Sequence, residues 1–437
     1  MTARVTSRRR RWIALLVAAA CLGLALVSGA GAQGDDRTWK RQQAPDPEIA
    51  NRPQAGPKTL ERHANALELL FEERYVEARQ ELDKLYFKRL NPVEQAMIHQ
   101  DYAYIASAEE KRDEARQRFQ QAIDSGGLYE QVKDVQFKIA MLWMQDEEWE
   151  QASQTLEEWF TLEPDPNSSS YYILALTYYQ QERLDDALIP ARKAVEISDA
   201  PKESWLQLLL GIHLLQKDYQ GAIPVLEQLL ALYPSRNYFM NLSTVYGALG
   251  DYKEAAIPLQ LAYEEGLLEE DDHLRRLGQL LLFLNLPYRA AEVLDEGLGQ
   301  EVIEPDTEVL EMLSNSWIAA REYEAAVHPL ERAAALAPTG DLYVRLAQVH
   351  VQRENWDGAT AALRKALEKG GLEDTGNAHL LMGIALYSDD DPGAARGWFQ
   401  SASGFETTEQ EASVWISHID QELAQQQAAA DDAAAGG

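Results

Sequence analysis

Apolar and small residues recur along this chain in a motif that repeats about every 35 residues. Its clearest form is an aromatic residue followed three positions later by alanine, with copies that begin at Tyr75, Trp149, Tyr219, Tyr252, Tyr323 and Trp356. Looser copies end at Ala115, Ala187, Ala290 and Ala395. The alanines of successive copies are 33 to 37 residues apart. A fixed period of this length predicts stacked supersecondary units, one for each of the ten copies.

Each motif is flanked by apolar positions at helical spacing. Twelve residues before the motif alanine, nine of the ten copies have a small residue, and Leu210 is the exception. Four residues after it, nine copies have a large apolar residue, and Ala191 is the exception. Spacings of this kind define one face of a helix. We therefore predict two antiparallel helices per unit, in close approach at the small residues, with looser packing around Leu210 and Ala191 in the fourth and fifth units.

Prolines mark the second predicted helix of several units. Three follow the motif alanine by twelve residues and should end that helix: Pro164, Pro234 and Pro338. Four others follow it by two or three residues and lie inside the helix: Pro190, Pro224, Pro258 and Pro329. A proline inside a helix removes a backbone hydrogen bond, so each of these four is expected to kink its helix.

These features resemble the tetratricopeptide repeat family, from about Lys58 to Phe405. The resemblance implies an all-α superhelical solenoid of about ten helix-turn-helix repeats over residues 58–406. In this family the first helix of each repeat lines a concave wall, which commonly binds an extended or helical peptide of a partner protein. The fold class predicted for this chain is therefore a solenoid with a binding groove.

The C-terminal residues after the last repeat differ in composition from the repeats. Residues 407–427 predict a helix that caps the solenoid and directs four apolar side chains toward it: Val414, Ile416, Ile419 and Leu423. Residues 428–437 contain only Ala, Asp and Gly, and we expect them to form a disordered tail.

The N-terminal residues predict an export signal. Four arginines, Arg8 to Arg11, precede an apolar run from Trp12 to Ser28, and a small-x-small cleavage pattern follows at Ala30 to Ala32. We expect residues 1–32 to be a cleaved signal peptide and the remaining chain to be periplasmic; a retained membrane anchor is the alternative. Residues 33–57 are rich in proline and polar residues and predict a disordered linker.

Charge and motif content argue against several functions. The chain has 40 basic and 71 acidic residues, a formal net charge of -31, which disfavours nucleic acid as a partner. No two of its eight histidines are three or four residues apart, the spacing at which a helix presents two metal ligands. Its one cysteine, Cys21, lies in the predicted signal peptide. Neither a glycine-rich phosphate loop nor a nucleophile elbow is present in the sequence. We therefore predict no catalytic site, cofactor, metal or small-molecule substrate, and no enzymatic activity.

The predicted concave wall is rich in Tyr, Gln, Asn and Met. Counted from the small residue of each first helix, the family geometry places the candidate protein-binding residues at Tyr104, Phe137, Met141, Tyr172, Tyr179, Gln207, Thr244, Arg275, Gln279, Asn315, Gln348 and Tyr387. Tyrosine supplies flat contact area and amides pair with peptide groups, so this composition suits a backbone-rich ligand. Arg275 is the only cation among these positions, which disfavours a ligand with a free C-terminal carboxylate.

Three strings carry a closer resemblance: Glu203 to Leu210, Leu261 to Leu268, and Pro287 to Ala291. They look like exported repeat proteins that accompany the TonB energy-transduction system of Gram-negative bacteria. This resemblance implies an accessory of TonB-dependent transport, with TonB or its proton-channel subunits as partners. Two alternatives stay open: a scaffold for envelope assembly, secretion or polysaccharide export, and a regulatory subunit of an enzyme complex.

Overall fold

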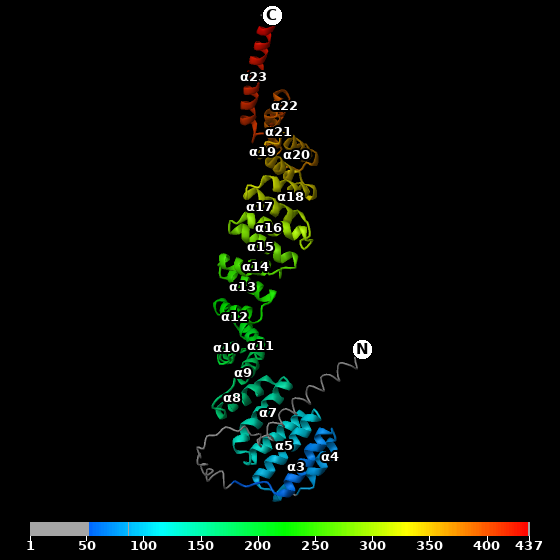
Figure 1. Cartoon of the computed structure of the whole chain (residues 1–437), viewed down its shortest axis with the longest axis vertical. Helices are drawn as coiled ribbons and strands as arrows, with labels where there is room; N and C mark the ends of the chain where they lie inside the picture. Colours follow the sequence, from blue (N-terminus) through cyan, green and yellow to red (C-terminus); the bar gives the residue numbers. More distant parts are fainter. Residues whose placement is uncertain (1–51, 86, 436–437) are drawn as a thin grey trace, which may run out of the picture.

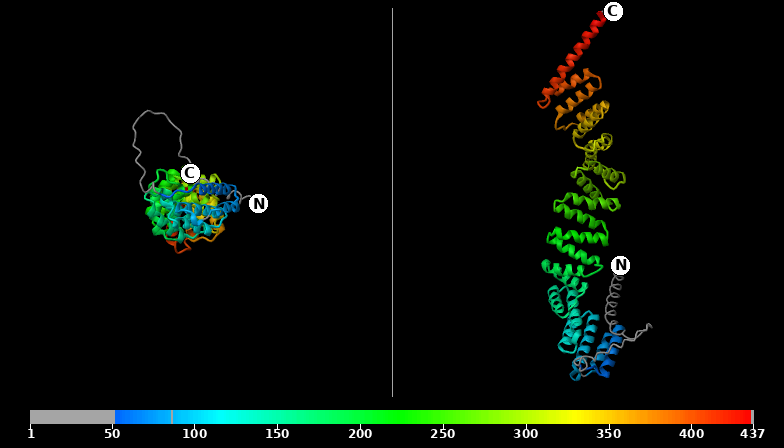
Figure 2. Two further views of the ribbon diagram at one scale, coloured as in Figure 1. Left: turned by 90° about the horizontal axis from the view of Figure 1, so that it is seen from below. Right: turned by 60° about the vertical axis from the view of Figure 1, so that its left-hand side comes forward.

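The computed structural model describes residues 52–85 and 87–435, and over these residues the chain is entirely helical. The predicted signal peptide and most of the predicted linker lie outside the described residues. Figures 1 and 2 show helix pairs stacked along one long axis, from α3 at the N-terminal end to α23 at the other. No helix in the described ranges is both long and apolar enough to cross a membrane.

Helices α3 to α22 form ten antiparallel pairs, as predicted. The first helices of the pairs are α3 (Pro57–Phe71), α5 (Pro92–Ala108), α7 (Val132–Gln145), α9 (Ser168–Gln180), α11 (Glu203–Leu215), α13 (Arg236–Ala248), α15 (Asp271–Phe283), α17 (Thr307–Ala319), α19 (Asp341–Gln352) and α21 (Thr375–Ser388). The second helices are α4 (Tyr75–Asp83), α6 (Arg112–Asp124), α8 (Trp149–Leu162), α10 (Leu184–Glu196), α12 (Tyr219–Leu232), α14 (Tyr252–Glu264), α16 (Pro287–Gly299), α18 (Tyr323–Leu336), α20 (Trp356–Lys369) and α22 (Pro392–Ala402). Short 3-10 turns, η1 (Phe87–Arg89) and η2 (Tyr129–Gln131), lie in two of the connections.

Every pair is joined by the same turn. The residue two positions before the second helix has a left-handed backbone in all ten pairs, and these residues are Glu73, Glu110, Glu147, Glu182, Lys217, Gly250, Asn285, Arg321, Glu354 and Asp390. The following backbone N–H donates to a carbonyl five residues back, as Lys111 does to Ala106 at 2.8 Å. This is the Schellman arrangement that ends a helix. It fixes the antiparallel return of each second helix, although only one of the ten positions is glycine.

The small residue of the first helix packs against the large residue of the second. A Cβ on Gly278 would lie 2.9 Å from Leu294, and one on Gly383 would lie 2.7 Å from Phe399. A larger residue therefore does not fit at these two positions without movement of its neighbour. The two exceptions to the pattern, Leu210 and Ala191, are 5% and 1% exposed and belong to one apolar cluster. Both are thus accommodated within the core.

The helices that contain internal prolines continue past them. Helices α10, α12, α14 and α18 run unbroken across Pro190, Pro224, Pro258 and Pro329. All except Pro224 are buried, so the pyrrolidine rings contribute to packing between helices. The kink expected at each of them stays a prediction.

Helix α23 (Glu409–Ala435) follows the last pair. Ile419 is fully buried, and Ile416 and Leu423 pack against the same apolar cluster. The prediction for Val414 was wrong, because this side chain is 66% exposed. Trp415, one residue further on, contacts the solenoid instead. Its ring stacks on that of Phe399, with centroids 5.3 Å apart and an interplanar angle of 1°.

The same helix also extends beyond its predicted end. It was expected to stop at residue 427, but it continues through Ala435 into the segment predicted to be a tail. Alanine has the highest helix propensity of the amino acids, which favours continuation of the helix over residues 428–435.

Candidate protein-binding surface

The first helices lie on the inner side of the solenoid. First helices of neighbouring pairs contact one another directly, most extensively between α3 and α5, α9 and α11, α15 and α17, and α19 and α21. Second helices of neighbouring pairs make no comparably extensive contact in the described part of the chain. The side on which neighbouring elements are closer is the concave side of a curved stack. The candidate residues therefore belong to helices that line the concave wall.

None of the twelve candidate residues is fully buried. Four are exposed: Gln207, Thr244, Gln279 and Gln348. The other eight are partly buried, which leaves part of each side chain accessible: Tyr104, Phe137, Met141, Tyr172, Tyr179, Arg275, Asn315 and Tyr387.

Several candidate residues connect neighbouring first helices. The rings of Tyr172 and Trp205 join α9 to α11, with centroids 6.0 Å apart. Gln207 donates a hydrogen bond to the hydroxyl of Tyr238 at 2.7 Å and so joins α11 to α13. The rings of Tyr104 and Phe137 instead contact the second helix of their own pair, at Phe119 on α6 (5.4 Å) and Trp159 on α8 (5.1 Å). These residues stabilise the wall in addition to facing it.

Arg275 is already paired with carboxylates. Its guanidinium forms ion pairs with Asp271 and, at 2.9 Å, with Asp306. The hydrogen bond that Arg275 donates to Asp271 holds the pKa of Arg275 above its usual range, and Arg275 in turn lowers the pKa of Asp306. The one cation among the candidates is thus engaged within the chain.

Tyr387 is engaged by the C-terminal helix. Its hydroxyl donates to the carboxylate of Glu422 at 2.9 Å and lies 3.0 Å from Nε2 of His418. The hydrogen bond to Glu422 raises the pKa of Tyr387. Helix α23 therefore packs against the wall at the last repeat and partly covers Tyr387.

Five candidates have no side-chain hydrogen bond, ion pair or ring contact to any other described residue: Met141, Tyr179, Gln279, Asn315 and Gln348. Three of them, Gln279, Asn315 and Gln348, occupy equivalent positions on α15, α17 and α19. The Oδ1 atom of Asn315 is buried and has no hydrogen-bond partner in the described ranges. An amide offers both a donor and an acceptor to a peptide group. The three form a row of free amides along the C-terminal half of the wall.

A pocket adjoins this row between α13, α14 and α15. Its volume is about 360 Å³, and its lining residues are Ser243, Gly247, Tyr252, Ala255, Arg276, Gln279, Leu280 and Phe283. Only Gln279 of these was a candidate from the sequence. A signal was present at Gly247, because the equivalent position in other repeats has larger side chains, such as Met144 and Tyr179. Without the geometry of the neighbouring repeat, that signal could not be interpreted as a cavity.

The histidines with the most specific contacts have structural roles. Nδ1 of His213 lies 2.8 Å from the carboxylate of Asp218, and a Cβ on Gly221 would lie 2.4 Å from the same nitrogen. His63 and the buried Asp101 are 2.9 Å apart and join α3 to α5. The hydrogen bond to Asp101 raises the pKa of His63, and burial raises that of Asp101.

One group of potential metal ligands brings together Glu270, Asp272 and His273. Glu270 and Asp272 are exposed, and the carboxylate of Glu270 already pairs with Arg236 at 2.8 Å. Two exposed carboxylates, one of them already paired with an arginine, are typical of a solvated acidic surface.

Residues 212–266 and 344–405 match the tetratricopeptide repeat family model. No curated protein matches the chain. Among solved structures, a MamA protein is 21% identical and similar over 40% of this chain and 93% of its own, with a TM-score of 0.33. A tetratricopeptide repeat protein from Parabacteroides merdae is 18% identical over 58% of this chain and 98% of its own, with a TM-score of 0.29. YrrB, described as a TPR protein with an unusual peptide-binding site, is 21% identical over 43% and 95%, with a TM-score of 0.32.

The family match supports the tetratricopeptide repeat family suggested by the residues. The matched segments lie in the fifth, sixth, ninth and tenth repeats, and the same helix pair and turn recur in all ten. The fold is therefore a tetratricopeptide repeat solenoid. Solenoids of this class present extended concave surfaces, which is consistent with a scaffold for protein–protein interaction.

Proposed function

We propose that this protein is an exported, non-enzymatic scaffold whose concave wall binds an extended segment of a partner protein. The row of free amides at Gln279, Asn315 and Gln348 is the observation that carries this proposal. Neighbouring packed helices are about 8–10 Å apart, a distance that about three residues of extended peptide span. Successive amides along the wall can therefore pair with peptide groups about three residues apart in one ligand.

The proposed location is the periplasm, and the proposed partner is TonB or one of its proton-channel subunits. The predicted signal peptide supports the location, and the resemblance to TonB-associated repeat proteins supports the partner. A proline-rich periplasmic segment of TonB would be extended before binding, which lowers the entropy lost on binding. The tyrosines in the N-terminal half of the wall, such as Tyr179, offer flat surfaces on which proline rings can pack.

A binding titration tests this proposal. A synthetic proline-rich segment of TonB is titrated into the chain that starts at residue 33, and into the double variant Asn315→Ala/Gln348→Ala. We expect micromolar affinity for the parent chain and a loss of about tenfold or more in the variant, since roughly two hydrogen bonds are removed. The matched control is Gln220→Ala/Gln400→Ala, which truncates two exposed glutamines on second helices.

The control variant should bind as the parent does. Equal affinity of all three proteins would show that the segment does not use the concave wall. No binding to any of them would remove TonB as the partner, and the partner would then have to be sought among envelope assembly or secretion components.

A further inference from the structure

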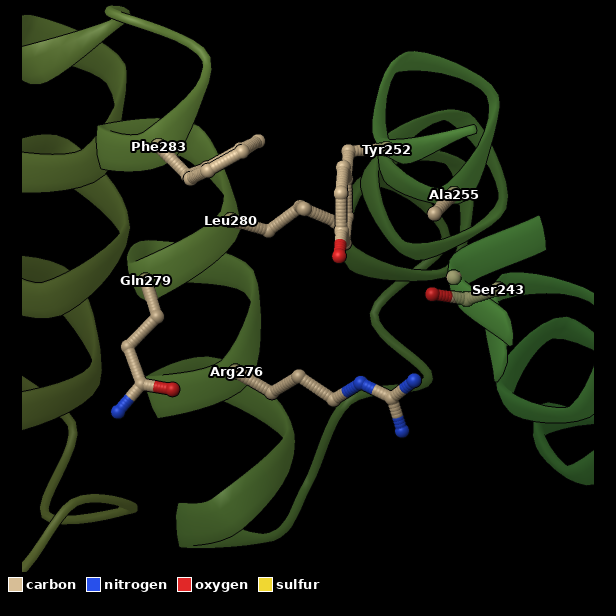
Figure 3. Close-up of a pocket in the computed structure, with 8 residues that line it drawn as sticks. Ser243, Tyr252, Ala255, Arg276, Gln279, Leu280 and Phe283 are labelled. Carbon is tan, nitrogen blue, oxygen red and sulfur yellow. The ribbon is translucent and has the colours of Figure 1, made fainter. Parts of the chain in front are cut away.

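The pocket between α13, α14 and α15 has an apolar part and a polar part. Figure 3 shows the side chains of Tyr252, Leu280 and Phe283 gathered in one part of it. The rings of Tyr252 and Phe283 are in edge-to-face contact, 4.7 Å apart, although both residues are exposed. The hydroxyl of Ser243 and the guanidinium of Arg276 lie in the other part (Figure 3). The pocket therefore offers two different environments to a single ligand.

Ser243 is a buried polar group without a partner. Its residue is 1% exposed, and its Oγ forms no hydrogen bond with any described residue. The hydroxyl points into the pocket in Figure 3. A buried hydroxyl without a hydrogen bond is costly, and a ligand atom that accepts from it removes that cost.

Arg276 has a positive charge that no carboxylate in the described ranges compensates. Its Nη2 donates to Oγ1 of Thr244 at 3.0 Å, and no described Asp or Glu forms an ion pair with it. The adjacent Arg275, in contrast, pairs with two carboxylates. The planar fork of donors of Arg276 suits a carboxylate.

Gly247 leaves the pocket open. A Cβ added to this glycine would meet no atom within 4 Å, in contrast to Gly278, where it would meet Leu294 at 2.9 Å. Glycine at position 247 is therefore required neither for close helix packing nor for a left-handed backbone conformation. The empty space is instead part of the pocket.

We propose that this pocket binds an apolar side chain together with a neighbouring carboxylate, both from the partner segment that follows the wall. The apolar side chain packs against Tyr252, Leu280 and Phe283. The carboxylate accepts hydrogen bonds from Arg276 and Ser243, and Gln279 continues the site into the row of amides. This inference rests on the proposed function and adds the chemistry of one anchor residue pair to it.

Filling the pocket provides the main test. Gly247→Leu places a side chain in the open space, and because leucine is a better helix former than glycine, the thermal unfolding midpoint should stay the same or rise. The matched control is Gly397→Leu, at another helical glycine whose added Cβ would meet nothing within 4 Å. Loss of binding in Gly247→Leu alone cannot then be ascribed to loss of folding.

The probes are two capped peptides, acetyl-Ser-Leu-Glu-Ser-amide and acetyl-Ser-Leu-Gln-Ser-amide, followed by saturation-transfer NMR. We expect the Leu-Glu peptide to bind the parent chain with a Kd on the order of 1 mM, and at least about fivefold more tightly than the Leu-Gln peptide. Gly247→Leu should abolish binding of both. Arg276→Gln should remove the preference for Glu, whereas Arg332→Gln, on the exposed surface of α18, should keep it.

Ser243→Ala adds an independent readout. Removal of an unpartnered buried hydroxyl should maintain or raise the thermal unfolding midpoint of the free protein, while the affinity for the Leu-Glu peptide falls roughly threefold to tenfold. Equal binding of both peptides, or unchanged binding in Gly247→Leu, would overturn the assignment of the pocket.

The two proposals fail separately. If the partner segment loses affinity in Asn315→Ala/Gln348→Ala but not in Gly247→Leu or Arg276→Gln, the wall binds the partner and the pocket does not. If Gly247→Leu blocks the Leu-Glu peptide while the double variant leaves the partner segment unaffected, the pocket is a site but the wall is not the partner's groove.

Discussion

Nδ1 of His213 lies 2.8 Å from the carboxylate of Asp218, and the ring passes so close to Gly221 that no side chain fits there. Asp218 also caps α12, because its other carboxylate oxygen accepts the backbone N–H of Gly221 at 3.0 Å. The same three roles recur at His350, Asn355 and Gly358 in the ninth pair. The histidine, the capping residue and the glycine are therefore one structural unit.

Gly221→Ala should destabilise the protein by about 1–3 kcal/mol, because its Cβ would clash with His213 and Asp218. The change is measured as the free energy of unfolding in urea. Gly397→Ala provides the control, since its Cβ meets nothing within 4 Å, and it should be neutral or stabilising by up to about 1 kcal/mol. Equal effects at the two glycines would contradict the close packing of the histidine.

The left-handed backbone of the turn limits which residues position 147 tolerates. Its φ is 59°, a conformation that asparagine adopts readily and β-branched residues avoid. Glu147→Val should therefore lower the free energy of unfolding by roughly 1–2 kcal/mol, whereas Glu147→Asn should change it by less than about 0.5 kcal/mol. Both variants are compared in the same urea titration. A turn that tolerates valine as well as asparagine would not have the left-handed geometry.

His99 predicts a loss of stability in acid. Burial lowers its pKa to about 4, with a smaller contribution from Arg118, and its ring packs at 4.7 Å against Phe87. A histidine whose pKa is depressed by folding favours the folded state above its unfolded pKa of 6.5. This contribution is lost as the pH falls from 6.5 toward 4. The free energy of unfolding of His99→Phe should accordingly fall less over that range than that of the parent chain.

The capping helix predicts opposite outcomes for two aliphatic side chains. Ile419 is fully buried against the last repeat, and Val414 is 66% exposed. Ile419→Ala should destabilise the chain by about 2–4 kcal/mol, while Val414→Ala should stay within about 0.5 kcal/mol. Thermal unfolding followed by circular dichroism distinguishes them. A larger effect at Val414 would mean that the helix packs through the face predicted from the sequence.

The repeats could be predicted from the sequence because each unit has the same local pattern. The motif aromatic residue or its equivalent, from Tyr75 to Pro392, is the first residue of the second helix in all ten pairs. Because ten copies share the pattern, the fold can be predicted from the period even where one position, such as Leu210, departs from it.

The packing face of the capping helix and the pocket depend on contacts that do not recur from repeat to repeat, so the repeat pattern does not predict them. Val414 and Trp415 are adjacent apolar residues, and only the packing of Trp415 on Phe399 determines which of them faces the solenoid. The pocket requires that Gly247 on one repeat faces Arg276 and Phe283 on the next, a relation between repeats that no single motif contains. Wall residues such as Tyr172 are partly buried because they also join neighbouring helices. The sequence alone does not distinguish this packing role from ligand binding.

Site-specific photocrosslinking in intact cells can show whether the concave wall binds a partner segment. A photoreactive amino acid is placed at Gln348 on the wall or at Gln400 on a second helix, and crosslinked products from intact cells are identified by mass spectrometry. We expect a product with TonB or its proton-channel subunits from Gln348 and none from Gln400. The same product from both positions, or from Gln400 alone, would contradict binding along the wall.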